Sequence, residues 1–142
     1  MNKRTFYFLS FTWGIPMTLF GLLVALVLLC CGKKPKRCGW CWYFEIGEGW
    51  GGIELGAFFL VSKTATDHTR YHEHGHAIQN CYWGLLMPFV IGIPSMIRYW
   101  YRELRYHRKG KYPPTDYDSI WFERQATLLG AEYVLRIERG VL

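Results

Sequence analysis

A long uncharged segment near the amino terminus places the strongest limit on how this chain can fold. No charged residue occurs between Thr5 and Gly32, and the run FYFLSFTWGIPMTLFGLLVALVLLCC exceeds the roughly 20 apolar residues of a bilayer-spanning helix. A cleaved signal peptide would have a shorter apolar region ending in small residues, whereas this run ends in LLCC. The sequence therefore predicts a retained transmembrane anchor over residues 1–32, with Pro16 at a kink or near one end.

The basic charge of the chain lies mostly beside its apolar segments. Its net charge of +6 would suit nucleic acid in a soluble protein, but basic residues that flank apolar runs fit anionic lipid headgroups better. We therefore expect membrane lipids as partners and no nucleic acid. Four basic residues in GKKPKRC follow the anchor, and this excess favours a cytoplasmic location for the rest of the chain.

Residues 33–142 are predicted to form one membrane-associated domain that is mainly α with a small β element. Glycines interrupt aromatic and β-branched residues over 40–63, which predicts one or two strands with a turn near 47–52. A helix should follow from about His68 to Asn80, and further helical patterns occupy 98–118 and 118–140.

A second uncharged segment, from Ala77 to Ile97, has two interpretations. It is just long enough to span a bilayer, but Gly84, Pro88 and later breakers favour an irregular or partly inserted segment, and a buried helix and loop would also fit. A full crossing would put the residues before and after it on opposite sides of the membrane.

The sequence His72-Glu73-His74-Gly75-His76 satisfies the H-E-x-x-H pattern. Residues four apart share one face of a helix, so His72 and His76 can bind one zinc ion from successive turns. Glu73 is then close enough to take a proton from a metal-bound water. The alternative is a histidine-rich helix turn at a membrane surface, without a metal.

A catalytic zinc ion takes three protein ligands and keeps an open position for water. Glu123 is the best candidate for the third ligand, because it lies among apolar neighbours on the last predicted helix, where an unpaired carboxylate is costly to bury. The alternative for Glu123 is an exposed side chain next to Arg124. Shared ligation by His76 and Glu123 requires that 77–97 does not cross the membrane completely.

Several other residues carry weaker signals. His68 lies one turn before His72 and is a less favourable ligand, whereas His74 faces away from the zinc side and is expected at the surface or behind the ligands. Cys38 and Cys41 have the spacing of half a zinc knuckle, but no second such pair follows, so reduced thiols are favoured. The tyrosines that could stabilise an oxyanion are Tyr71, Tyr117 and Tyr133.

H-E-x-x-H followed by a later E-x-x-A resembles the glutamate-zincins, and distantly the CAAX prenyl protease and heat-shock membrane protease family. In the run SIWFERQAT, Ser119 and Thr127 stand where that family has Asn and Asp, which weakens the expected support around the ligands. The run HEHGHAIQ, with the later G-x-P-S, is also similar to short bacterial membrane proteins. That resemblance covers about half of the chain.

The resemblance implies a zincin-like core of strand, H-E-x-x-H helix and later Glu-bearing helix. His72, His76 and Glu123 would hold Zn²⁺, Glu73 would be the general base, and Gly75 would allow close packing beside the metal. The strand within 51–61 would bind the backbone of a peptide or protein substrate.

The leading hypothesis is therefore a zinc metallopeptidase, an endopeptidase, anchored in a bacterial inner membrane with its site on the cytoplasmic side. The alternatives are a zinc-binding membrane protein without proteolysis, acting as a regulator or scaffold, and a metal-free membrane-surface protein.

Overall fold

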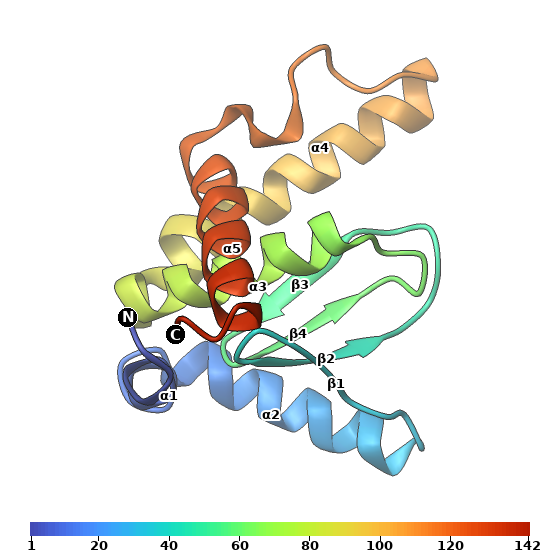
Figure 1. The fold of residues 1–142 in the computed structure, drawn as a ribbon. Coiled ribbons are helices and arrows are strands. Elements are labelled where there is room, and N and C mark those ends of the chain that lie inside the picture. The colour runs from blue at the N-terminus through green and yellow to red at the C-terminus, as the bar shows by residue number, and fades with distance from the viewer.

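The computed structural model describes residues 1–142 and is mainly helical, with one small sheet (Figure 1). The elements run α1 (Lys3–Ser10), α2 (Ile15–Cys30), β1 (Lys36–Cys38), β2 (Cys41–Glu45), β3 (Gly52–Leu55), β4 (Phe58–Val61), α3 (Asp67–Trp83), η1 (Gly84–Leu86), η2 (Pro88–Gly92), α4 (Ile93–Lys109), η3 (Tyr117–Ser119) and α5 (Trp121–Glu138). The predicted class, mainly α with a small β element, is confirmed.

The first apolar run does not form the single transmembrane helix that the sequence predicted. It forms α1 and α2, which are bent by 89° at the break between them, and Pro16 lies in the first turn of α2, where its missing N–H is harmless. Phe6 of α1 is fully buried in the main core. The predicted boundary between residues 1–32 and 33–142 remains a prediction.

No helix of the chain is by itself both long and apolar enough to cross a membrane. Two bent helix pairs reach that length and composition when the two helices of a pair are counted as one. One pair is α1 with α2, and the other is the α3–η1 segment with the η2–α4 segment, with a bend of 115° between them.

The sheet is mixed and has the strand order β1-β2-β4-β3. The two outer pairs are antiparallel, whereas β2 and β4 are parallel, with Trp42 opposite Phe58. The predicted turn near 47–52 separates β2 from β3. Because β3 pairs only with β4, its other edge is open for further strand pairing.

Helices α3 and α5 cross at very short distance, and small residues make this possible. A Cβ added at Gly75 would lie 1.8 Å from the carbonyl oxygen of Ala126, and one added at Gly130 would lie 1.7 Å from that of Tyr71. The close packing that the resemblance implied for Gly75 is therefore present. This crossing brings the first half of α3 against the first half of α5, where the predicted ligands lie.

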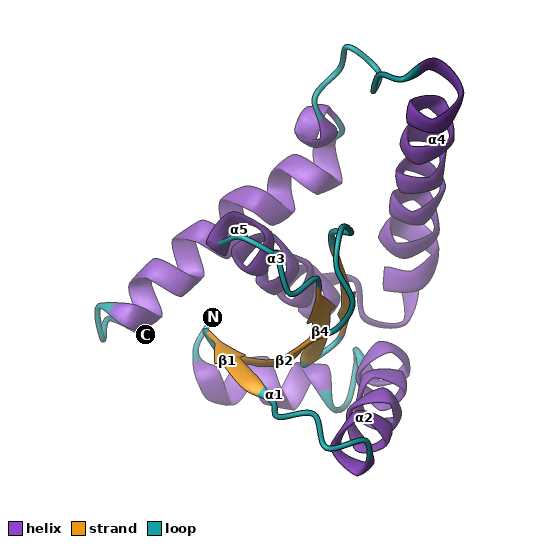
Figure 2. Cartoon of the chain, turned by 90° about the vertical axis from the view of Figure 1, so that its right-hand side faces the viewer, coloured by secondary structure: helices purple, strands orange, loops and turns teal.

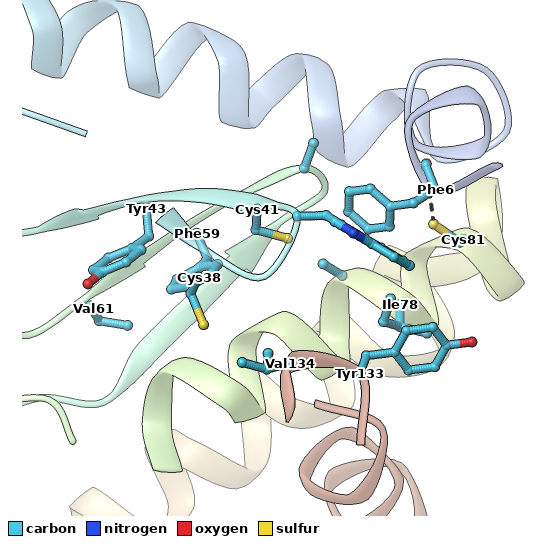
Figure 3. Close-up of a cluster of buried hydrophobic side chains, with 13 residues drawn as sticks. Phe6, Cys38, Cys41, Tyr43, Phe59, Val61, Ile78, Cys81, Tyr133 and Val134 are labelled. Atoms are coloured by element: carbon cyan, nitrogen blue, oxygen red, sulfur yellow. Dashed lines mark hydrogen bonds between the residues drawn. The ribbon is translucent and has the colours of Figure 1, made fainter. Parts of the chain in front are cut away.

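The main core lies between the sheet, α1, α3 and α5. Figure 3 shows Phe6 beside Cys81, Cys38 and Phe59 on the sheet, and Ile78, Tyr133 and Val134 on the two crossing helices. This core fixes α3 against the sheet from behind, so that the opposite side of α3 faces a cleft.

The second uncharged segment turns back instead of continuing straight. Helix α3 extends to Trp83, and Gly84 then adopts a positive φ of 51°, which favours glycine. The short helices η1 and η2 lead into α4, which has no buried residue. Figure 2 shows α2 and α4 on the same side of the molecule, with α4 standing away from α5.

Candidate metal centre

Three side chains that are distant in sequence converge where α3 crosses α5. The Nε2 atoms of His72 and His76 are 3.1 Å apart, and Oε2 of Glu123 lies 3.0 Å from the first and 3.2 Å from the second. All three residues are buried, and together they form a group that could hold a metal ion. Glu123 thus lies beside the two histidines, as the predicted ligand set requires, and its binding of a metal ion remains a prediction.

The spacing of these atoms fits a small tetrahedral ion. Bonds of about 2.0–2.1 Å in tetrahedral geometry separate neighbouring ligand atoms by roughly 3.3–3.4 Å. The observed distances of 3.0, 3.1 and 3.2 Å are only slightly shorter. Two imidazoles and one carboxylate therefore form one triangular face of such a site, and a fourth position remains for water or substrate.

Hydrogen bonds behind the two imidazoles fix which nitrogen faces the centre. Thr127 donates its hydroxyl proton to Asp118 at 2.7 Å, so its oxygen accepts from Nδ1–H of His72 at 2.8 Å. Nδ1–H of His76 donates to Oε1 of Gln79 at 2.7 Å. In both rings the Nε2 atom is thereby left as the ligand atom, the usual arrangement in histidine metal sites.

Glu123 is oriented from both of its oxygens. Oε1 accepts a hydrogen bond from the Ser95 hydroxyl at 2.5 Å, which leaves Oε2 directed at the imidazoles. Burial alone would raise the pKa of this carboxyl, but the contacts with the imidazoles of His72 and His76 and the hydrogen bond from Ser95 lower it well below its usual range. Glu123 is therefore a carboxylate, the form that binds metal.

The imidazole of His76 carries a positive charge when the centre holds no metal. Burial opposes that charge, but the hydrogen bond to Glu123 and the carboxyl groups of Glu73, Glu123 and Glu54 outweigh it and raise the pKa to about 9. A proton on Nε2 thus occupies the position where a metal ion would bind.

Glu73 lies beside the centre and against the sheet. A Cβ added at Gly52 of β3 would lie 2.6 Å from Oε1 of Glu73, so a side chain there would displace this carboxyl from its position against the strand. Burial raises the pKa of Glu73, and the neighbouring His72 and His76 lower it only in part. A carboxyl in this setting is suited to accept a proton.

A cleft of about 740 Å³ runs along the exposed side of the centre. Its floor is α3 and the open edge of β3, and its walls come from α2, η2, α4 and the loop before α5. Its apolar lining includes Met17, Phe20, Met87, Ile91, Met96 and Trp100.

The other predicted residues lie at different distances from this centre. His74 is fully buried, which corrects the expectation of a surface position; its Nε2 accepts from the Trp40 amide at 3.3 Å, and its ring stacks on Phe6. His68 lines the cleft but is not part of the ligand group. Of the three tyrosines predicted as oxyanion donors, only Tyr117 lines the cleft, with its ring 6.2 Å from that of His72.

Cys38 and Cys41 form no metal group. Both thiols are free and buried in the core beside α1 and α3, and burial raises the pKa of each. The Cys38-Gly39-Trp40-Cys41 hairpin instead packs against the side of α3 that carries His74, where the Trp40 amide donates to His74.

Three residues that support the ligands were not predicted as such from the sequence, namely Ser95, Asp118 and Thr127. Threonine at position 127, in place of aspartate, was expected to weaken the support of the ligands. Instead, Thr127 accepts a hydrogen bond from His72 and donates one to Asp118. The sequence offered one signal for this support: Asp118 lies nine residues before Thr127, just before α5 begins. Ser119, the other departure, bonds Arg98 instead.

Searches with this chain match no protein-family model, no curated protein and no solved structure.

Proposed function

We propose that this chain is a zinc-dependent hydrolase of peptide bonds that works at a membrane. The observation that carries the proposal is the convergence of His72, His76 and Glu123 to within 3.2 Å, next to the buried carboxyl of Glu73 and the open edge of β3. A site of two histidines and one glutamate with a free fourth position is the arrangement of catalytic rather than purely structural zinc.

When bound, zinc supplies a Lewis acid that polarises a carbonyl and acidifies a water molecule. The residues of the chain would do the rest. Glu73 accepts the proton of the attacking water and delivers it to the leaving amine. Tyr117, at the edge of the cleft, would exchange its hydrogen bond to Ser95 for one to the developing oxyanion, and burial together with Glu123 keeps it protonated by raising its pKa.

The edge of β3 supports a peptide as the substrate. Ladder bonds alternate along an antiparallel pair, and Ser62 N–H bonds the Gly51 carbonyl, so Gly52 and Glu54 direct their backbone groups away from β4. An extended peptide in the cleft can pair with these groups as an added strand.

The apolar surfaces of α2 and α4 support a membrane as the location. Outside the cleft, helix α2 exposes Leu19, Leu23 and Val27, and α4 exposes Ile97 and Leu104 before ending in His107, Arg108 and Lys109. Apolar residues next to a basic helix end suit the boundary between acyl chains and anionic headgroups.

Zinc stoichiometry of purified protein tests the centre directly. Wild type is expected to bind one equivalent, and His76→Ala and Glu123→Ala to lose or weaken it, whereas His68→Ala should retain it. Glu73→Gln should keep zinc and lose hydrolysis of a quenched fluorescent peptide library. A zinc-replete wild type in which a fourth protein ligand is seen by X-ray absorption would instead favour a regulator or scaffold.

A further inference from the structure

Glu54 is a buried carboxyl that the proposed hydrolysis does not use. It lies on β3, two residues after Gly52, and only 6% of its surface is exposed. Side chains two apart on a strand share a face, so Glu54 points to the same side as the Glu73 contact at Gly52. It lines the cleft, whose apolar lining includes Met17, Met87 and Ile91.

No cation of the chain is dedicated to Glu54. Its Oε1 accepts the Gly56 amide, while no donor of the chain bonds Oε2 and none of the ion pairs includes this residue. The one arginine that lines the cleft, Arg102, belongs to α4 and donates to the Thr115 carbonyl. His76 is the nearest positive group, but its charge is already shared with Glu123.

A carboxylate in such a place is expensive unless a positive group joins it. Burial raises the pKa of Glu54 to about 8, against opposing effects of His76 and the Gly56 amide. An apolar alternative would avoid this cost altogether. The cost is offset when a ligand in the cleft brings a cation to Glu54.

We propose that Glu54 binds a primary ammonium group of the substrate, and so selects peptides by a positive charge just before the bond that is hydrolysed. This inference rests on the proposed function and deepens it. The ammonium can be a free amino terminus or a lysine side chain. Its three N–H groups would satisfy the unbonded Oε2.

The position of Glu54 along the strand sets the distance to the reacting bond. Successive strand residues rise about 3.3 Å, so Glu54 lies roughly 7 Å along the edge from Gly52, where Glu73 is placed. A peptide antiparallel to β3 has its amino-terminal part at Glu54 and its carbonyl near Glu73. In the parallel direction a terminal carboxylate would approach Glu54 and be repelled. The bond hydrolysed is then one or two residues after the residue that carries the ammonium, whether this is the amino terminus or a lysine.

Binding without turnover tests this inference separately from the proposed hydrolysis. The zinc-loaded Glu73→Gln protein is titrated calorimetrically with tetra-alanine and with N-acetyl-tetra-alanine. The free amine is expected to bind at least about 30-fold more tightly, because only the ammonium gives the Glu54 carboxyl a charged partner in the cleft. A second pair, N-acetylated peptides with lysine or norleucine at the first position, tells whether a side-chain ammonium is accepted.

Adding Glu54→Gln should abolish the preference for the ammonium, because the amide keeps the Gly56 hydrogen bond but loses the charge. Glu103→Gln is the matched control, since Glu103 also lines the cleft but pairs with Tyr112, and it should keep the preference. Zinc content shows that each variant retains its centre. Equal affinities, a preference that survives Glu54→Gln, or no binding of any of the four peptides at millimolar concentration would overturn the inference. Whether wild type hydrolyses peptides is a separate readout.

Discussion

The Oγ1 atom of Thr127 lies 2.8 Å from Nδ1 of His72 and accepts its proton in a hydrogen bond, while the Thr127 hydroxyl donates to Asp118. This bond sets the tautomer that leaves Nε2 free for metal. Thr127→Val keeps the shape but removes the acceptor, so the Nδ1 proton is left unpaired. We expect zinc affinity to fall about 10–100-fold, the usual effect of losing a residue that orients a ligand. Competition with a fluorescent chelator measures it.

Thr115→Val is the control for that change. Thr115 is exposed in the loop before α5, and its side chain makes no hydrogen bond in the chain. Its replacement should leave zinc affinity unchanged. If Thr127→Val also left it unchanged, the hydroxyl would not be orienting His72, and Asp118 would have no part in the centre.

Gly75 tests whether the helix crossing positions the ligands. In Gly75→Ala the new methyl group would lie 1.8 Å from the Ala126 carbonyl oxygen, which is backbone and cannot turn aside. Helices α3 and α5 must therefore separate, and Glu123 moves away from His72 and His76. We expect a loss of at least about 2 kcal/mol in unfolding free energy and a clear loss of zinc binding.

Gly51→Ala provides the comparison, because a Cβ there meets nothing within 4 Å and the backbone needs no positive φ. Thermal unfolding and zinc content of the two variants should differ sharply. Similar behaviour of both would mean that the crossing tolerates a methyl group and that another contact holds the ligands together.

The residues of the candidate metal site could be predicted from the sequence only in part. His72, Glu73 and His76 follow from helical periodicity, because residues four apart share a face whatever the rest of the chain does. Glu123 followed from the cost of an unpaired carboxylate among apolar residues. Ser95 and Asp118 could not be found in this way, since their positions depend on the turn after α3 and on the loop that follows α4.

The fold shows a similar limit. Apolar composition over residues 5–32 does not distinguish one long helix from two bent ones, and it could not show that Phe6 of the first helix packs into the core. His74 was misplaced for a related reason. Periodicity places it away from the zinc side, but it could not show that the Cys38–Cys41 hairpin covers that side of α3.

Zinc binding should depend on pH through His76. In the metal-free protein the pKa of His76 is about 9, so at pH 7 its Nε2 carries a proton that the metal must displace. Affinity is therefore expected to rise by roughly tenfold per pH unit below pH 9 and to level off above it. Calorimetry at pH 7 in buffers of different ionisation enthalpy should detect about one proton released per ion. Uptake without proton release would contradict a charged His76 in the empty centre.

The basic end of α4 tests the proposed membrane contact. Arg108 is exposed in the last turn of α4, and that helix exposes Ile97 and Leu104 on its earlier turns. Each basic residue near an anionic surface contributes about 1 kcal/mol, so Arg108→Glu should weaken sedimentation with phosphatidylserine-containing vesicles by at least about fivefold at low salt. Arg139→Glu makes the same charge change after α5, near the carboxyl terminus, which lies far from the end of α4 in Figure 1. Equal losses in the two variants would indicate attraction by net charge alone, whereas a loss confined to Arg108→Glu would identify α4 as the lipid-facing helix.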